Sequence, residues 1–210
     1  MNETANSSSP VALVTGSTSG IGAAIARRLS NEGYAVVLHS RSSTETGHAL
    51  AVELGKAMYI QADLADDADR IRLVREAVSR WNRLDVLVNN AGISSVIPHT
   101  DLMAALPAVW HELYEVNVVA PFRLVAEAET ALRDAARRGR PACVVNISSH
   151  AGVRPKGASI PYAASKSMRD QTLKPGCTEN NRQLQTESYN ALASELPPSV
   201  LAANHMPRKI

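Results

Sequence analysis

The hydrophobic positions of the chain follow two alternating patterns. Short apolar runs predict strands that are buried on both faces, and the longer segments between them repeat apolar residues every three or four positions, as helices do. The predicted strands are residues 11–14, 34–39, 57–61, 84–88 and 142–147. Strands and helices that alternate in this way predict an α/β domain with a parallel sheet.

Helices are predicted between these strands. They cover residues 21–31, 44–54 and about 108–137, with one more segment that opens near residue 66 and another around residues 162–166. Asp66 or Asp67 would cap the segment that opens near residue 66. Its apolar residues Ile71, Val74 and Val78 fall on one face, so we expect the arginines between them to be solvated and to have no function.

Three glycines, Gly16, Gly20 and Gly22, follow the first predicted strand. Residues without a Cβ suit a sharp turn, a close approach to a ligand and tight packing of a helix on a strand. The next helix would direct free N–H groups and the positive end of its dipole at this turn, which favours a pyrophosphate. This motif alone leaves an ordinary glycine-rich connection open as the alternative.

A polar loop, residues 40–43, follows the second predicted strand. In a doubly wound sheet, the ribose of a bound nucleotide lies at this place. An acidic residue there would favour a free 2′-hydroxyl, whereas Arg41 between serines favours a 2′-phosphate and therefore NADP. A solvated arginine in a surface loop is the alternative.

The length and composition of the chain favour a single globular domain and argue against a nucleic-acid-binding or membrane protein. The 210 residues suit one domain with a sizeable core, preceded by a polar tail at residues 1–9 that we expect to be disordered. A net charge of +2 gives no electrostatic argument for nucleic acid, and no apolar run reaches the roughly 18 residues of a membrane span. Of the two cysteines, Cys143 lies in an apolar run typical of a buried thiol. We therefore expect a cytoplasmic protein that binds neither nucleic acid nor membrane.

Three motifs stand in a fixed order: TGSTSGIG at residues 15–22, NNAG at 89–92 and YAASK at 162–166. Together they resemble the short-chain dehydrogenase/reductase family, and the resemblance covers residues 10 to about 170. It implies a Rossmann-like, doubly wound parallel sheet in three αβα layers. It also implies that residues 10–174 form an NAD(P)-binding domain.

Tyr162 and Lys166 stand four residues apart and would share one face of a helix, with Pro161 suited to its first turn. An ammonium group beside a phenol stabilises the phenolate. It lowers a pKa that is ordinarily about 10, so that the phenol can act as acid or base. For this pair alone, a solvated tyrosine and lysine on a helix surface are the alternative.

The resemblance extends the pair to a catalytic group. It implies that Ser149 holds the substrate oxygen, with Ser148 as the neighbouring alternative. It implies that Asn117, a polar residue among valines, helps to hold Lys166; a locally satisfied helix residue is the alternative. The implied reaction is reversible hydride transfer between C4 of the nicotinamide and a carbonyl carbon, with Tyr162 as the acid or base.

The same resemblance implies the contacts to the dinucleotide. Asp63 and Leu64 would face the adenine, Asn90 would lie near its ribose, and Lys166 would bind the nicotinamide ribose. The full predicted set of cofactor residues is Gly16, Ser17, Thr18, Ser19, Gly20, Ile21, Gly22, Arg41, Asp63, Leu64, Asn90, Ala91, Gly92, Tyr162 and Lys166. The dispersed histidines and carboxylates predict no metal site.

The resemblance ends at about residue 168. Members of the family continue with two more strands and a Pro-Gly turn, whereas here Pro175 and Gly176 precede a polar stretch without strand character. We therefore expect a sheet that lacks the usual last strands, an atypical tail at residues 175–210, and a homo-oligomer that is weaker than in the family. Two functions stay open: an NADP(H)-dependent oxidoreductase acting on a small-molecule carbonyl or alcohol, and a truncated, inactive protein that at most binds a nucleotide or a partner.

Overall fold

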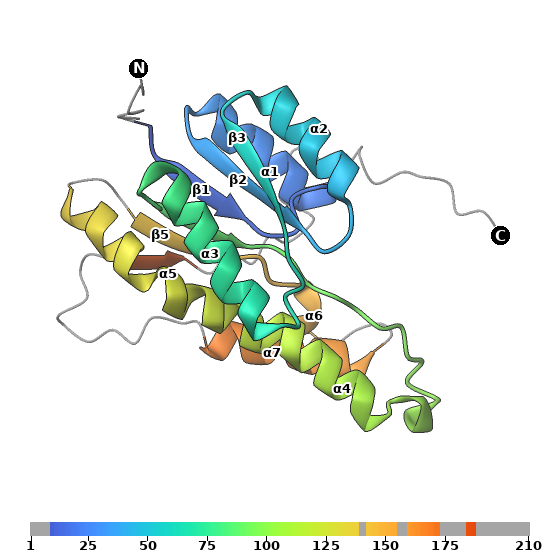
Figure 1. Cartoon of the computed structure of the whole chain (residues 1–210). Coiled ribbons are helices and arrows are strands. Elements are labelled where there is room, and N and C mark those ends of the chain that lie inside the picture. Colours follow the sequence, from blue (N-terminus) through green and yellow to red (C-terminus); the bar gives the residue numbers. More distant parts are fainter. Residues whose placement is uncertain (1–8, 139–141, 155–158, 173–183, 188–210) are drawn as a thin grey trace, which may run out of the picture.

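A parallel sheet of six strands forms the centre of the molecule, with helices on both faces (Figure 1). The computed structural model describes residues 9–138, 142–154, 159–172 and 184–187. The strands are β1 (Val11–Val14), β2 (Ala35–Ser40), β3 (Ala57–Gln61), β4 (Val86–Asn89), β5 (Ala142–Asn146) and β6 (Leu184–Glu187). Their order is β3-β2-β1-β4-β5-β6, and each neighbouring pair is parallel. This is the doubly wound order, so the predicted fold class is confirmed.

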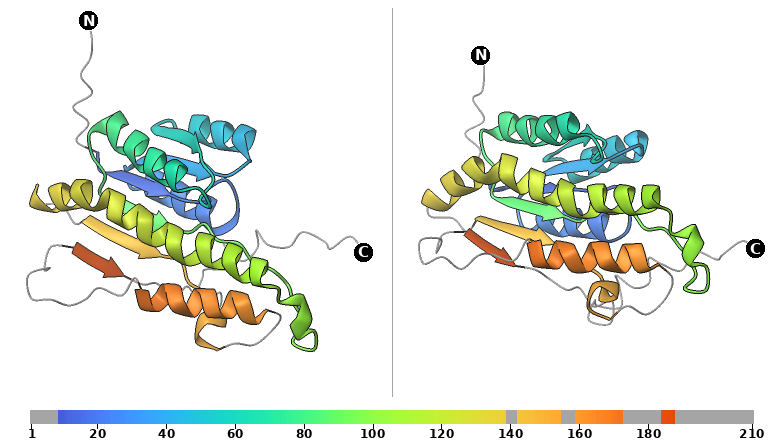
Figure 2. Two further views of the ribbon diagram at one scale, coloured as in Figure 1. Left: turned by 60° about the horizontal axis from the view of Figure 1, so that its bottom comes forward. Right: turned by 90° about the horizontal axis from the view of Figure 1, so that it is seen from below.

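The helices fall into two layers. They are α1 (Gly20–Asn31), α2 (Thr44–Leu54), α3 (Asp67–Trp81), α4 (Pro107–Tyr114), α5 (Ala120–Arg137), α6 (His150–Val153) and α7 (Ile160–Thr172), with a 3₁₀ turn η1 (Leu102–Ala104) and a π-helical segment η2 (Glu115–Val119). Helices α3, α5 and α7 lie side by side on one face of the sheet, and α1 and α2 cover the other (Figure 2). None of the described helices is long and apolar enough to cross a membrane.

The central strand β1 shows why apolar runs predict this sheet. All four of its side chains are buried, and they alternate between the two faces. Val11 and Leu13 join the core under α3 and α5, while Ala12 and Val14 join the core under α1 and α2. A strand that is buried on both faces needs an unbroken apolar run, which the sequence has here.

The chain leaves β1 and β4 toward opposite faces of the sheet. It passes from β1 to α1 on one face and from β4 toward α5 on the other, although the two strands are neighbours. In open α/β sheets, ligands bind outside the carboxyl ends of the strands at such a switch point. The turns after Val14 and Asn89 therefore frame the candidate site.

The structure corrects the prediction that no strand follows the fifth one. Residues 184–187 form β6, which pairs in parallel with β5 from Ala142 to Val145. A strand at the edge of a sheet is held by main-chain hydrogen bonds on one side, so a polar segment can form it without an apolar pattern. Residues 173–183 and 188–210, with Pro175 and Gly176, lie outside the described part of the chain. The division into a domain of residues 10–174 and an atypical tail stays a prediction.

Candidate active site

The glycine turn after β1 requires two special main-chain conformations. Gly16 and Gly20 have φ angles of +62° and +52°, which residues with a Cβ seldom adopt. At Gly22, a Cβ would lie 2.2 Å from the carbonyl oxygen of Gly16. The first turn of α1 therefore packs directly on the main chain of the turn, and its N-terminus faces the carboxyl edge of the sheet.

Asn90 joins this turn to the turn after β4. Its Nδ2 donates to the carbonyl oxygens of Thr15 at 2.9 Å and Gly16 at 3.0 Å. In return, the hydroxyl oxygen of Thr15 accepts hydrogen bonds from the main-chain N–H groups of Asn90 and Ala91, both at 3.0 Å. The amide of Asn90 therefore holds the glycine turn in place, and its predicted position near a ribose stays a prediction.

An open crevice of about 550 Å³ lies between the two turns. It brings together twelve of the predicted cofactor residues with five others, His39, Ser42, Ala62, Ile93 and Val116. The twelve are Gly16, Thr18, Ser19, Gly20, Ile21, Gly22, Arg41, Asp63, Leu64, Asn90, Ala91 and Gly92. The predicted residues Ser17, Tyr162 and Lys166 do not line it.

Ser17 points away from the crevice because it is bonded to β2. Its N–H donates to the carbonyl oxygen of His39 at 2.9 Å, and its hydroxyl oxygen accepts from the His39 N–H at 2.9 Å. The ring of His39 also contacts the turn, since its Nδ1 lies 3.1 Å from the main-chain nitrogen of Gly16. Burial lowers the pKa of His39, although its hydrogen bond to Ala62 acts in the opposite direction.

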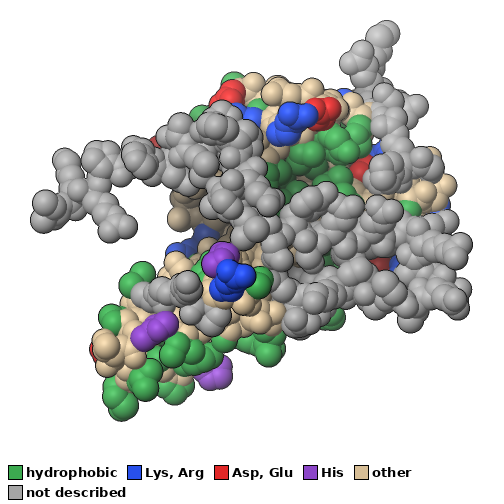
Figure 3. Space-filling model, turned by 180° about the vertical axis from the view of Figure 1, so that it is seen from behind, with side chains coloured by type: hydrophobic (Ala, Val, Ile, Leu, Met, Phe, Trp, Pro, Cys, Tyr) green, Lys and Arg blue, Asp and Glu red, His purple; other side chains and the backbone are tan. Residues whose placement is uncertain are grey.

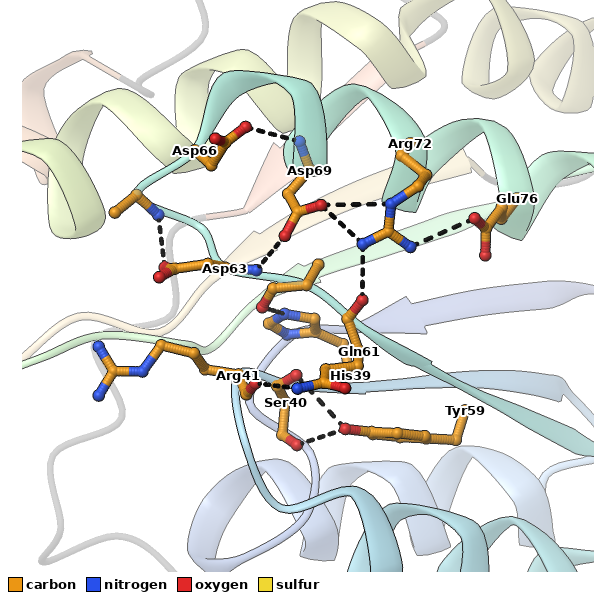
Figure 4. A network of polar contacts seen from close by, with 12 residues as sticks. His39, Ser40, Arg41, Tyr59, Gln61, Asp63, Asp66, Asp69, Arg72 and Glu76 are labelled. Atoms are coloured by element: carbon orange, nitrogen blue, oxygen red, sulfur yellow. Dashed lines mark hydrogen bonds and ion pairs between the residues drawn. The ribbon is translucent and has the colours of Figure 1, made fainter.

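Arg41 lies at the rim of the crevice, at the edge of a polar network (Figure 4). Its carbonyl oxygen accepts a hydrogen bond from Gln61 Nε2 at 2.9 Å, and the Gln61 carbonyl accepts one from Arg72 at 2.8 Å. The Arg41 guanidinium extends away from the network and forms no hydrogen bond or ion pair with any residue that the structure describes. Its main chain is thus fixed, while its charge is available to a ligand.

Asp63 and Asp69 order the loop between β3 and α3. Asp69 accepts a hydrogen bond from the Asp63 N–H at 2.7 Å and forms an ion pair with Arg72, also at 2.7 Å. The hydrogen bond from the Asp63 N–H, followed by that from Arg72, lowers the pKa of Asp69. The carboxylate of Asp63 accepts from the Ala65 N–H, so it is engaged within its own loop.

Asn117 is buried in the π-helical segment η2. Its Oδ1 accepts from the N–H of Ile93 and its Nδ2 donates to the Ile93 carbonyl, both at 2.9 Å. The same Nδ2 lies 3.0 Å from the hydroxyl oxygen of Ser165 in α7. The π-helical turn of η2 contains one more residue than an α-helical turn, and it places the side-chain amide of Asn117 between the loop after β4 and helix α7.

Lys166 is buried beside this amide and beside the crevice. Its Nζ lies 3.4 Å from the carbonyl oxygen of Ile147 and 5.7 Å from the ring centroid of Tyr162. Gly92 allows the approach, because a Cβ there would lie 3.0 Å from Asn117 Oδ1 and 3.2 Å from Lys166 Nζ. The structure therefore gathers Asn117, Lys166 and Tyr162 at the border of the crevice.

Ser149 follows β5 and is the N-cap of α6. Its hydroxyl oxygen accepts a hydrogen bond from the Ala151 N–H at 3.2 Å. Because that contact uses a lone pair of the oxygen, the hydroxyl proton stays able to donate to a ligand. Helix α6 packs on α7, which carries Tyr162.

Arg70 contradicts the prediction that the arginines of α3 are solvated. Its side chain is 3% exposed, its Nε donates to the Leu64 carbonyl at 2.7 Å, and its guanidinium bonds to Glu115 at the start of η2. Leu64 and Val116, the neighbour of Glu115, both line the crevice. Arg70 therefore links two walls of the crevice through a contact that helical periodicity does not reveal.

No group of three or more histidine, cysteine or carboxylate side chains that could hold a metal ion occurs within the described ranges. His39, Ile93 and Val116 also line the crevice, and their sequence context contains little that predicts it. Only His39 departs from its apolar surroundings, as a polar residue that follows four buried apolar positions of the same strand. That signal did not indicate a function, because the partners of the ring lie in other parts of the chain.

The family model described as short chain dehydrogenase matches residues 10–179. The chain belongs to this family. Among curated relatives, a protein named ketoacyl reductase 2 of the granaticin polyketide synthase of Streptomyces violaceoruber is 52% identical over 156 residues. These residues are 74% of this chain and 61% of that relative, so the chain spans less than two thirds of the relative's length.

Two solved structures of related proteins carry bound dinucleotides. A metagenomic short-chain oxidoreductase in complex with NADP is 33% identical, with a TM-score of 0.74 over 85% of this chain and 80% of that one. The 3-ketoacyl-(acyl-carrier-protein) reductase of Brucella melitensis in complex with NADH is 26% identical, with a TM-score of 0.78 over 85% of this chain and 73% of that one. Similar chains therefore hold either dinucleotide.

Proposed function

We propose that this short-chain dehydrogenase/reductase interconverts a carbonyl and an alcohol by hydride transfer with a nicotinamide dinucleotide. The observation that carries the proposal is the position of Gly92. This residue lines the crevice, and the space beside its Cα is occupied by Asn117 Oδ1 and Lys166 Nζ. The crevice and the catalytic candidates thus share a border, as a reaction between a dinucleotide and a substrate requires.

The residues of the crevice fit a dinucleotide. Gly22 lets the first turn of α1 pack on Gly16, where a Cβ would collide. Within the described part of the chain no side chain caps the N-terminus of α1, so the first N–H groups of this helix can bind a pyrophosphate in the crevice. When bound, the nicotinamide would supply or accept the hydride. Every other part of the reaction is assigned to side chains of this chain.

Tyr162 would donate a proton to the substrate oxygen during reduction and remove it during oxidation. Lys166, buried next to the Tyr162 ring, would stabilise the phenolate that is left behind. Ser149 would orient the substrate oxygen through the hydroxyl proton that its cap hydrogen bond leaves available. Asn117 would act as a positioning residue, since it holds Ser165 in the helix that carries Tyr162 and Lys166.

We propose that the preferred dinucleotide is NADP(H). Arg41 supports this proposal, because its guanidinium is unpaired within the described part of the chain and lies at the rim where a 2′-phosphate would be placed. Asp63, an acid that lines the crevice, has its carboxylate engaged with the Ala65 N–H. A planar guanidinium binds phosphate through two parallel hydrogen bonds, which would add specificity to charge.

We propose that the substrate is a 3-oxoacyl thioester or a polyketide ketone, since the 52% identical relative is named a ketoacyl reductase. The test is consumption of NADPH by the purified protein with a 3-oxoacyl thioester of N-acetylcysteamine. We expect turnover that disappears in Tyr162→Phe, while NADPH binding stays within about twofold, because the phenol supplies the proton and little of the crevice. Binding without turnover in the unaltered protein would instead support an inactive nucleotide-binding protein.

We also propose that the protein pairs with a second copy of itself through α4, α5 and α7. Apolar side chains gather over the end of the molecule that carries η1 and α4 (Figure 3). Exposed Trp110 and Tyr114 in α4, Phe122 in α5 and Met168 in α7 are large apolar groups that an interface would remove from water. Light scattering should give a dimer or larger species, and Trp110→Glu should shift it toward the monomer.

A further inference from the structure

His39 occupies the floor of the crevice, between the glycine turn and the end of β3. It is the fifth residue of β2, its side chain is buried with an exposed fraction of 2%, and it borders the crevice. Its Nδ1 lies 3.1 Å from the nitrogen of Gly16, and its Nε2 lies 3.0 Å from the carbonyl oxygen of Ala62. The ring therefore bridges the two segments that would enclose the adenosine half of a dinucleotide.

These two contacts determine where the ring proton resides. A carbonyl oxygen can only accept a hydrogen bond, so Nε2 must carry the proton that faces Ala62. The main-chain N–H of Gly16 can only donate, so Nδ1 must present its lone pair. The neutral tautomer that is protonated on Nε2 satisfies both contacts. A second proton on Nδ1 would point at the main-chain N–H of Gly16, and the hydrogen bond between them would be lost.

The surroundings of the ring favour this neutral form. Burial is the largest influence on the pKa of His39 and lowers it, and the cation of Arg72 acts in the same direction. The carboxylates of Asp63 and Asp69 and the contact with Ala62 act in the opposite direction but are smaller influences. The hydrogen bond to Gly16 is therefore present at neutral pH and is lost when the ring is forced to take up a proton.

We propose that His39 is a positioning residue for the dinucleotide: its neutral ring holds the glycine turn in its binding conformation, and protonation of Nδ1 releases the turn and weakens binding. This inference rests on the proposed binding of a dinucleotide in the crevice. The turn has a second link to β2, from the N–H and the hydroxyl of Ser17 to the main chain of His39, so it stays attached to the sheet when the ring contact is lost. The expected effect is accordingly a change in cofactor affinity and not the loss of the fold.

Two substitutions separate the two contacts of the ring. In His39→Asn, the side-chain oxygen can take the position of Nδ1, so an acceptor for Gly16 is kept while the titratable group is removed. In His39→Gln, the amide nitrogen can reach the position of Nε2, so the contact to Ala62 is kept while the acceptor for Gly16 is lost. Exposed His48 on α2 gives a matched control, His48→Asn, which removes a histidine outside the crevice.

The measurement is the dissociation constant of NADPH and of NADH for each protein at several pH values between 5 and 8. At pH 8 we expect His39→Asn to bind within about twofold of the unaltered protein, and His39→Gln about fivefold to tenfold more weakly, the usual effect of one lost hydrogen bond. Below pH 6.5, the unaltered protein and His48→Asn should lose affinity for both dinucleotides relative to His39→Asn. Comparison with His39→Asn at each pH cancels titration of the 2′-phosphate, whose second pKa is about 6.

Three outcomes would count against the proposed role of His39. Equal affinities in His39→Gln and the unaltered protein would overturn the inference, as would a His39→Asn protein with the same acid dependence as the unaltered one. In both cases the proposed binding of a dinucleotide would stand, because binding itself would have been observed, and the proposed reaction would be unaffected by this result. If the unaltered protein bound neither dinucleotide at any pH, the proposed function would fail and this inference with it.

Discussion

Asn117 and the main chain of Ile93 form a closed pair of hydrogen bonds, each 2.9 Å long. The pair joins the π-helical segment η2 to the loop that follows β4, and the third bond of the amide reaches Ser165 in α7. One buried side chain therefore fixes three segments at the border of the crevice. Its removal should affect both the stability of the protein and the geometry of the site.

We expect Asn117→Ala to lower the free energy of unfolding by about 2 kcal/mol, because it leaves an N–H and a carbonyl of Ile93 without their partner. Chemical denaturation measures this change. Asn31→Ala, at the exposed C-terminal end of α1, is the matched control and should change stability by less than about 0.5 kcal/mol. Equal losses in the two variants would contradict a structural role for the amide pair.

Arg41→Ala should reduce the preference for NADPH over NADH by about tenfold or more, through weaker binding of NADPH alone. The reason is that a charge-assisted contact to a phosphate is worth about 1.5–3 kcal/mol, while the rest of the dinucleotide is unchanged. Titration calorimetry with both dinucleotides tests it. Arg80→Ala, which removes an arginine on α3 that does not line the crevice, should leave the ratio unchanged.

Arg70→Met should destabilise the protein by about 2 kcal/mol. The substitution leaves the Leu64 carbonyl and the Glu115 carboxylate without the cation between them. The Arg70 side chain is 3% exposed and that of Glu115 is 40% exposed, so the pair is partly buried and its loss costs more than the loss of a fully exposed pair. In Arg75→Met, an arginine that is 71% exposed loses an ion pair with Glu127, and the expected change is less than about 0.5 kcal/mol. Thermal and denaturant unfolding of the two variants should therefore differ clearly.

Asp69 should contribute to the acid sensitivity of the fold. Its pKa in the folded protein is lowered, so the carboxylate stabilises the folded state above the unfolded value of about 3.9, and this contribution is lost as the pH falls through the folded value. Asp69→Asn should flatten the dependence of stability on pH below about 4. Acid titrations followed by circular dichroism test it, with exposed Glu45→Gln as the control; an unchanged acid midpoint in Asp69→Asn would refute the expectation.

The sheet was predictable wherever burial on both faces required an apolar run, as in β1 and β4. Strand β6 was missed because pairing at the edge of a sheet depends on the main chain and leaves little pattern in the sequence. In the same way, the periodicity of α3 shows which face is apolar but not that Arg70 meets Glu115, which lies in a different helical segment. The contacts of His39 depend on which loops meet in space, and no local pattern encodes them.

The motifs predicted which residues the fold brings together around one crevice better than they predicted the contacts of each side chain. The glycine turn, Asn90 and Gly92 all border one crevice, as the switch point of the sheet requires. The amide of Asn90 nevertheless serves the turn itself, and Ser17 faces β2 instead of the crevice. Spacing along the sequence locates a main-chain feature, while the orientation of each side chain is decided by the neighbours that it finds after folding.

The π-helical segment η2 also connects α4 to α5 in one continuous helical element. Its wider turn changes the direction in which the side chains of α5 point relative to those of α4. Upstream, α4 packs against α7; downstream, Leu124, Ala128 and Leu132 of α5 enter the core against the sheet. Each residue of an α-helix advances it by about 100°, so deleting Val118 or Val119 would rotate one part by that angle against the other. A regular helix could satisfy one of these surfaces but not both, and the wider turn at Asn117 is what allows the two packing patterns to coexist in a single continuous element.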